Sequence, residues 1–137
     1  MGIPYDALED DTSILDQEDV LRRVPAYFYV DDEDAQGIIR RRPSSQAFQD
    51  SKNPPSPMSV FRARALDNPE EALEGHADFG LVALRVGFLR SMCGQRVAQD
   101  PEDDAPRGHT YVIGNKTSRV RKQMAQHAEE IVQPPPT

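Results

Sequence analysis

The sequence predicts an α+β fold: a small mixed, mainly antiparallel sheet packed against two to three helices, with an amphipathic helix near the C-terminus. Three observations predict it. Short segments rich in branched and aromatic residues, such as 109–114, alternate with turn signals. Hydrophobic residues make up 37% of the 137 residues, which suffices for one core and not for two. In residues 118–132, apolar side chains recur at the spacing of one helix face: Val120, Met124, Ala128 and Ile131.

The two ends of the chain set the limits of the predicted domain. Residues 1–15 mix acids with sparse apolar groups and lack a sustained period, so we expect a flexible acidic arm. Residues 133–137, QPPPT, are expected to be a disordered proline-rich tail. Residues 16–132 then form a single α+β domain.

The domain begins with a predicted short helix. Asp16 can cap residues 17–23, QEDVLRR, whose acids lie at the positive end of the helix dipole. Pro25 ends this helix. Residues 25–30, PAYFYV, are predicted to form a strand because aromatic and branched residues dominate them.

Short elements follow. The acidic residues 31–34 predict a turn, and residues 38–42, IIRRR, a short strand. Ser44 or Ser45 can cap a single helical turn. Residues 53–57, NPPSP, cannot donate a regular hydrogen-bond ladder, so we expect an extended surface loop there.

A strand and a capped helix come next. Residues 58–66, MSVFRARAL, alternate apolar and polar side chains, which is typical of a strand with one wet face. Asn68 as cap, Pro69 at the first helical position and Glu71 at the third form the strongest helix start in the chain.

Residues 78–93 allow two assignments. The first is one continuous helix. The second is a buried strand at 80–84 followed by a helix at 85–92 that Gly94 ends. We favour the second assignment because two glycines inside the segment weaken a long helix.

The last third of the chain has clearer patterns. Residues 96–99, RVAQ, predict a short strand, and the acidic, proline-containing residues 100–108 a turn. Residues 109–114, HTYVIG, predict a strand that ends at a glycine. The amphipathic helix is expected at 118–132.

Charge and composition exclude several classes of protein. A net charge of −7 argues against a nucleic-acid binder, which must neutralise phosphates. Arg85 and Arg90 interrupt the longest apolar stretch, so no membrane helix is expected. The single Cys93 cannot form an intramolecular disulfide, which favours a soluble protein of the reducing cytoplasm.

The most informative segment runs from the strand at 109–114 into the C-terminal helix. Basic residues occupy the first turns of that helix, where they oppose the helix dipole unless an anion binds there. The plainer alternative is a capped helix with a solvated basic side. The candidate ligand- or anion-binding residues are His109, Lys116, Thr117, Ser118, Arg119 and Arg121.

A second basic cluster is a candidate partner-binding surface. Residues 1–34 hold eleven acidic residues, whereas residues 35–66 hold six basic residues and one acid. If the predicted strands pair, their arginines form a positive stripe that could receive the acidic arm, a partner's acidic segment or a nucleic-acid backbone. A solvated sheet edge is the alternative. These arginines are Arg40, Arg41, Arg42, Arg62 and Arg64.

The sequence predicts no metal site, no cofactor and no catalytic residue. The three histidines lack ligand spacing, and no GxSxG motif marks a serine nucleophile. As a catalytic base, His109 would need a partner near Arg22, Tyr27 or Ser59.

These observations favour a small, non-catalytic accessory protein of prokaryotic type that binds an unidentified protein partner through charged surfaces. The alternative is a small enzyme or sensor. It would bind a phosphate-bearing ligand, such as a nucleotide, at the strand-turn-helix corner after Gly114.

Overall fold

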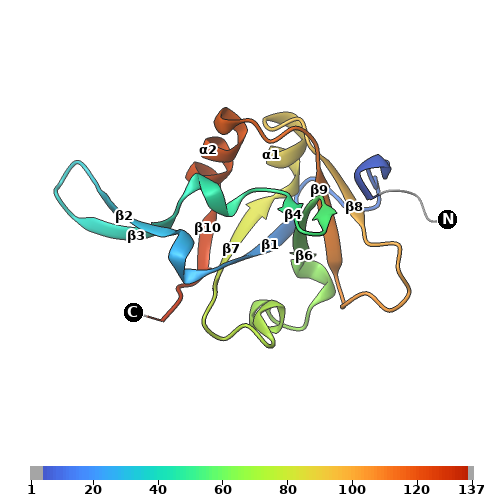
Figure 1. The fold of residues 1–137 in the computed structure, drawn as a ribbon, viewed down its shortest axis with the longest axis horizontal. Helices are drawn as coiled ribbons and strands as arrows, with labels where there is room; N and C mark the ends of the chain where they lie inside the picture. The colour runs from blue at the N-terminus through green and yellow to red at the C-terminus, as the bar shows by residue number, and fades with distance from the viewer. Residues whose placement is uncertain (1–4, 136–137) are drawn as a thin grey trace.

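The computed structural model describes residues 5–135, which form an α+β fold built mainly from antiparallel strands (Figure 1). Six strands make up the main sheet, in the order β10-β7-β1-β6-β9-β8. Two separate hairpins, β2-β3 and β4-β5, complete the described strands. The strands are Asp19–Val24 (β1), Tyr29–Glu33 (β2), Ile39–Pro43 (β3), Ser51–Lys52 (β4), Pro55–Ser56 (β5), Met58–Arg62 (β6), Gly80–Arg85 (β7), Arg96–Gln99 (β8), His109–Ile113 (β9) and Glu129–Val132 (β10).

Helices contribute less than the sequence predicted. The described residues contain two α-helices, Val86–Ser91 (α1) and Ser118–His127 (α2), and only α2 reaches seven residues. The expectation of two to three helices against the sheet therefore overstated the helical content. Five short 3-10 helices connect the strands: Tyr5–Ala7 (η1), Ala26–Phe28 (η2), Ser45–Ala47 (η3), Ala63–Ala65 (η4) and Pro69–Leu73 (η5).

Both α-helices cover the same face of the main sheet, which we call the helix face (Figure 1). Val20 and Val60, on the central strands β1 and β6, are fully buried there. They pack in one cluster with Leu89 of α1 and Met124 of α2. This cluster is the larger part of the hydrophobic core.

The opposite face, which we call the second face, is covered only by short segments. Leu21 and Phe61 are buried there with Ala72 of η5. Farther along the sheet, Tyr111 packs against Tyr5 of η1. Side chains point alternately to the two faces of the sheet along each strand. On β6 and on β9, the polar residues that alternate with buried helix-face residues therefore lie on the second face.

The N-terminal residues cover the edge strand β8. The backbone N–H of Asp11 donates to the Val97 carbonyl at 2.8 Å, and the Val97 N–H donates to Asp10 Oδ1 at 2.9 Å. Arg96 Nη2 donates to the Asp6 carbonyl at 2.7 Å, and Ile14 is buried in the core. The described part of the predicted acidic arm thus supplies hydrogen-bond partners to the backbone of edge strand β8, which would otherwise be exposed.

The predicted domain limits stay a prediction, because parts of both ends lie outside the described residues. Residues 1–4 of the arm and 136–137 of the tail are in those parts. Within the described tail, Pro134 is buried, and its carbonyl accepts a hydrogen bond from Arg41 at 3.1 Å.

Several predicted elements are confirmed. The segment 78–93 forms strand β7 followed by helix α1, as the favoured assignment required. The strands at 38–42, 96–99 and 109–114 correspond to β3, β8 and β9. Asn68 caps η5 and accepts the backbone N–H of Glu71 at 3.2 Å, although the element is a 3-10 helix.

Two predicted helices were wrong, the first over its whole length and the second over its last part. Residues 19–24 form β1, which lies between β6 and β7, because pairing on both sides and burial of its apolar side chains on the two faces of the sheet outweigh local helix propensity. The C-terminal helix ends at His127, where Ala128 takes an extended conformation. Residues 129–132 pair with β7 as β10 instead, so sheet pairing again overrides the helical pattern.

Smaller differences concern turns and strand ends. The predicted loop at 53–57 lies within the β4-β5 hairpin, and the acidic residues 31–33 extend strand β2 rather than forming a turn. The turn begins after them at Asp34, whose carboxylate accepts hydrogen bonds from the backbone N–H groups of Gln36 and Ile38. Strand β6 stops at Arg62, where η4 begins.

A buried ion pair joins the start of β1 to the end of β6. Glu18, whose side chain is 5% exposed, accepts from Arg62 Nε at 2.6 Å and Nη2 at 2.9 Å. It also accepts the backbone N–H of Leu15 at 2.8 Å. The hydrogen bonds from Arg62 hold the pKa of Glu18 below its ordinary value, and they outweigh the effect of burial.

This ion pair makes stability depend on acid pH. A carboxylate whose pKa is lower in the folded state stabilises the fold above its unfolded pKa, and that contribution is lost as pH falls through the folded pKa. We expect Glu18→Gln to cost about 1–3 kcal/mol at pH 7 and to flatten the loss of stability between about pH 5 and pH 3. Urea unfolding at several pH values measures both effects.

Glu129→Gln, at an exposed position on β10, is the matched control and should change stability by less than about 0.5 kcal/mol. If Glu18→Gln and the parent lost stability in parallel as the pH fell, the role assigned to Glu18 would be contradicted.

Candidate functional sites

A chain of polar side chains lies on the second face, where β6 pairs with β9. Their register sets Ser59 opposite Tyr111 and Phe61 opposite His109. Ser59 Oγ is hydrogen-bonded to His109 Nε2, and His109 Nδ1 lies 2.6 Å from Asp100 Oδ2. Asp100 directly follows β8, which pairs with the other side of β9. Three strands thus bring a serine, a histidine and an aspartate into line.

Asp100 is an ionised hydrogen-bond acceptor in this arrangement. Burial alone would raise the pKa of Asp100, but the backbone N–H of Glu102 and the imidazole of His109 outweigh burial and hold that pKa below its ordinary value. The hydroxyl of Tyr111 also points to Asp100 Oδ2, at 3.3 Å. Burial and the charge of Asp100 raise the pKa of Tyr111 to about 12, so this hydroxyl stays a donor at neutral pH.

The charge on Asp100 fixes the roles of the two imidazole nitrogens. An ionised carboxylate only accepts hydrogen bonds, so His109 Nδ1 must carry the proton that it shares with Asp100. In the neutral imidazole, Nε2 then has a lone pair that faces Ser59. Arg22 holds the backbone of Ser59 from the helix face, since its Nη1 donates to the Ser59 carbonyl at 2.8 Å.

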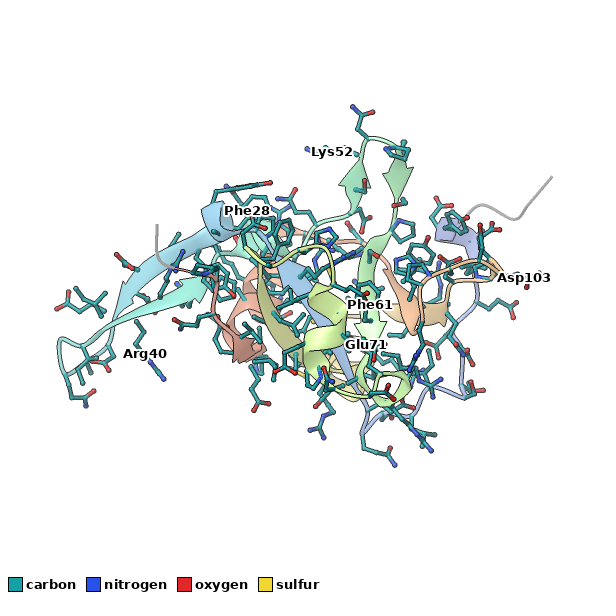
Figure 2. All side chains as sticks on the ribbon, turned by 90° about the horizontal axis from the view of Figure 1, so that it is seen from below. Phe28, Arg40, Lys52, Phe61, Glu71 and Asp103 are labelled. Atoms are coloured by element: carbon teal, nitrogen blue, oxygen red, sulfur yellow. The ribbon has the colours of Figure 1, made fainter. Side chains whose placement is uncertain are left out.

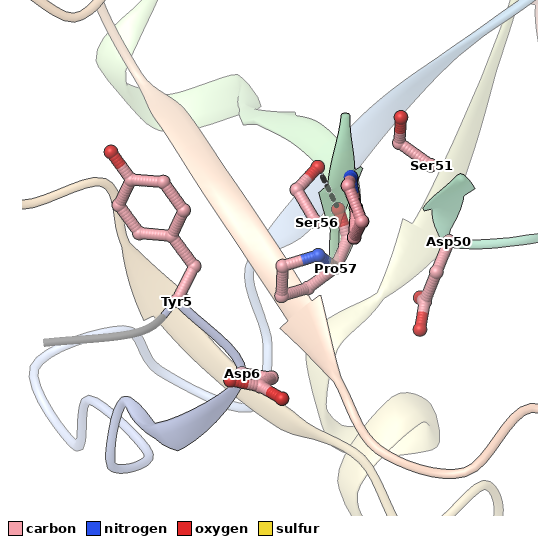
Figure 3. A pocket seen from close by; sticks show the side chains of 7 residues that line it. Tyr5, Asp6, Asp50, Ser51, Ser56 and Pro57 are labelled. Carbon is pink, nitrogen blue, oxygen red and sulfur yellow. Dashed lines mark hydrogen bonds between the residues drawn. The ribbon is translucent and has the colours of Figure 1, made fainter. Parts of the chain in front are cut away.

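Two hollows lie beside neighbours of this polar chain, and the residues that line them do not include Ser59, His109 or Asp100. The first, of about 400 Å³, opens between Tyr5 and Asp6 on one side and the β4-β5 hairpin with Pro57 on the other (Figure 3). The ring of Tyr5 stacks on Tyr111, with centroids 4.9 Å apart. The second, of about 560 Å³, includes Phe61, whose ring centroid lies 5.5 Å from that of His109.

The predicted anion-binding corner after Gly114 is formed, but its lysine already has partners. Lys116, whose side chain is 5% exposed, donates to Asp50 Oδ1 at 2.7 Å and to the carbonyls of Val112 and Gly114 at 2.9 and 3.2 Å. Burial lowers the pKa of Lys116, although Asp50 opposes that effect. These three acceptors match the three N–H groups of an ammonium ion.

The other corner residues differ in what they contact. Thr117 caps α2 by accepting the backbone N–H of Val120 at 3.2 Å, and Arg121 Nη1 reaches the Lys116 carbonyl at 3.5 Å. Ser118 and Arg119 are exposed on the first turn of α2. His109 begins β9, whereas the corner follows its end, so the structure does not bring His109 together with them.

The two groups of arginines in the predicted stripe lie on different elements. Within residues 5–135, β3 pairs with β2 alone, whereas β6 pairs with β1 and β9. Arg62 is bound to Glu18, and Arg64 lies 3.9 Å from the same carboxylate. In the described part of the acidic arm, Asp10 forms an ion pair with Arg90, and Asp16, the first residue after the arm, pairs with the same arginine.

The arginines of β3 line a groove between the β2-β3 hairpin and the C-terminal elements. Its volume is about 810 Å³. Arg41 lies 5.3 Å from the ring centroid of Tyr29, and Arg42 Nε lies 2.8 Å from Asp32 Oδ2. The side chain of Arg40 makes no hydrogen bond or ion pair with any residue that the structure describes. The groove is lined by Asp32, Ile39, Arg40, Arg41, Arg42, Pro43, Ala125, Gln126, Ala128, Glu130 and Gln133.

Sequence reasoning identified His109 but not the full chain of polar residues around it. Ser59 was one of three suggested partners, and Asp100 was assigned only to a turn. One signal was available, because Ser59 and His109 both alternate with apolar positions in predicted strands. It could not be used without knowing that these strands pair in a register that places both side chains on one face.

The chain matches no protein-family model, and comparisons with curated proteins and with solved structures found no match either. In residues 5–135, no helix has the length and hydrophobicity to cross a membrane. A function for this protein must therefore be inferred from the geometry of these sites.

The contacts of Lys116 predict a structural role for its ammonium group. We expect Lys116→Ala to destabilise the fold by about 1–3 kcal/mol, because it leaves two backbone carbonyls and Asp50 without their donor. Lys122→Ala, at an exposed position on α2, should change stability by less than about 0.5 kcal/mol. Urea unfolding compares the two variants, and equal small effects would contradict this role.

Proposed function

We propose that this chain is an accessory protein that binds a protein partner through the β2-β3 hairpin and its groove. One observation carries the proposal: the hairpin projects away from the main sheet (Figure 1) and exposes apolar and cationic side chains together. Ile38 and Ile39 are 59% and 66% exposed. Arg40 follows them and lies on the projecting hairpin (Figure 2).

The composition of this surface suits a protein interface. Exposed isoleucines at a hairpin tip contribute nothing to the core, whereas burial against a partner would remove their apolar area from water. Arginine is enriched at interfaces because its planar guanidinium forms bidentate hydrogen bonds and packs on apolar groups. Val30 on β2 is a further exposed apolar side chain of the same hairpin.

The charge of the groove favours a partner segment that combines acidic and apolar residues. Three arginines line it against two carboxylates, those of Asp32 and Glu130. Arg42 already contacts Asp32. Arg40 is the cation available to a carboxylate, and Ile39 beside it offers an apolar contact.

A cytoplasmic location is part of the proposal and is supported by the single cysteine, which is buried and free. The alternative function, a phosphate-bearing ligand at the corner after Gly114, has weaker support. Its support is the pair of exposed basic side chains Arg119 and Lys122 on the first turns of α2. The contacts of Lys116 with Asp50 and two carbonyls oppose it.

Charge reversal tests the binding surface. We expect Arg40→Glu to lower the amount of partner recovered with the tagged protein at about 0.15 M salt by roughly tenfold or more, because it repels an acidic segment. Arg119→Glu is the matched control, since its arginine is also exposed but lies on the first turn of α2 and does not line the groove. Quantitative mass spectrometry of both samples measures the recovery, and equal recovery from the two variants would contradict the proposal.

Site-specific cross-linking tests contact directly. A photo-reactive amino acid at position 39 should cross-link the partner in native cells, because Ile39 borders the groove. The same amino acid at Met92, which is exposed just after α1, should not. The proposal fails if the two positions give the same cross-linked products.

A further inference from the structure

We propose that Ser59 is a nucleophile that attacks acyl esters, with His109 as its general base and Asp100 as the residue that positions His109. This inference goes beyond partner binding, because it assigns chemistry to the second face of the sheet and not to the hairpin. It also replaces the expectation that the protein is non-catalytic.

The geometry that carries the inference is the unbroken hydrogen-bonded chain from serine to aspartate. Ser59 Oγ contacts His109 Nε2, and His109 Nδ1 contacts Asp100 Oδ2 at 2.6 Å. A serine hydroxyl is a weak nucleophile until an adjacent base removes its proton. An imidazole that is held by a carboxylate at its other nitrogen is such a base, and the same constellation occurs on unrelated folds.

The surroundings hold each group in place. The side chains of His109 and Asp100 are only 14% and 7% exposed, so bulk water screens their interaction weakly. Tyr111 and the backbone N–H of Glu102 supply further hydrogen bonds to Asp100. From the helix face, Arg22 fixes the carbonyl of Ser59. A side chain held this way loses little freedom when it reacts.

The neighbouring hollows indicate the class of substrate. Tyr5 and Pro57 line the hollow of about 400 Å³, and the ring of Tyr5 stacks on Tyr111, the cross-strand neighbour of Ser59. Two carboxylates, those of Asp6 and Asp50, line this hollow, and Lys116 is paired with Asp50. The hollow therefore suits an uncharged ester with a flat apolar group better than an anionic substrate.

The reaction step conserves atoms and electrons. As Ser59 Oγ bonds to the acyl carbon, its proton moves to His109 Nε2 and the carbonyl π electrons move to the carbonyl oxygen. When the tetrahedral adduct collapses, the bond from carbon to the ester oxygen breaks, and the leaving alkoxide takes the proton from Nε2. The products are acyl-Ser59 and an alcohol. Water can then repeat the sequence to release the carboxylic acid.

A purely structural role for the same hydrogen bonds makes a different prediction. In that case the hydrogen bonds among Ser59, His109 and Asp100 would only join β6, β9 and the end of β8. Removing these hydrogen bonds would then change the stability of the fold and nothing else. A nucleophile also reacts covalently. The test must therefore read out bond formation at Ser59 in the folded full-length protein.

A fluorophosphonate probe gives that readout, since serine oxygen displaces fluoride from phosphorus. We expect the folded parent to be labelled at Ser59 at least about 100-fold faster than the urea-unfolded protein, which is the scale of general-base assistance. Mass spectrometry of the peptide that contains residues 58–62 locates the adduct. Ser59→Ala should abolish labelling, and the matched control Ser91→Ala, from an exposed serine at the end of α1, should retain it.

Three further variants separate the base from the positioning residue. His109→Gln should lower the labelling rate by at least about 100-fold, because no base remains at Ser59. Asp100→Asn should lower it as well, and Asp100→Glu should restore part of the rate, because a carboxylate and not mere packing is required. Circular dichroism confirms that each variant is folded.

Hydrolysis of p-nitrophenyl acetate follows the reaction with an ester. We expect release of p-nitrophenol by the parent that Ser59→Ala lacks and Ser91→Ala keeps. Two results would overturn the proposal: a folded parent in which the fluorophosphonate leaves Ser59 unmodified, or labelling of Ser59 at the same rate in folded and unfolded protein. Both results come from the parent chain, so they decide the proposal even if Ser59→Ala does not fold.

Discussion

The pairing of β6 with β9 is the constraint on which the rest of the structure depends. It joins two strands about fifty residues apart in the sequence and completes a sheet in which β1 and β7 follow on one side and β8 on the other. Because side chains alternate along both strands, this register sends Val60 and Val112 into the core beneath the helices and leaves Ser59 and His109 together on the second face. The same strand register thus determines which side chains enter the core and which form the polar chain.

Ion pairs between charged side chains join neighbouring segments at the ends of the sheet strands. The ion pair between Glu18 and Arg62 joins the start of β1 to the end of β6. The ammonium group of Lys116 links the end of β9 to Asp50. Glu18, Arg62 and Lys116 each have a partner of opposite charge, as the low dielectric of an interior requires. The β2-β3 hairpin stands outside this network and presents its isoleucines and Arg40 to solvent (Figure 2). The surface proposed for partner binding is therefore separate from the polar chain around Ser59.

The sequence predicted those parts of the fold that depend on local composition. Strand β9 was found because branched and aromatic residues dominate it, and strand β7 because two glycines disfavour one long helix over residues 78–93. Strand β1 was missed because its residues favour a helix locally and become a strand only by pairing with β6 and β7. The helix at 118–132 was predicted too long for the same reason, since β10 needs the free edge of β7. At the site, the sequence singled out His109 and offered Ser59 as one of three partners, whereas Asp100 joins them only through strand register, which single-sequence patterns do not contain.

The most direct test of the Ser59 chemistry is the position of the imidazole proton on His109. Nitrogen-15 NMR of the full chain at neutral pH distinguishes protonated from unprotonated ring nitrogens. For the neutral imidazole we expect a proton on Nδ1, shared with Asp100, and a bare Nε2 that accepts from Ser59. The opposite tautomer, with the proton on Nε2 and none on Nδ1, would contradict it, because Nε2 would then donate to Ser59 and could not act as its base.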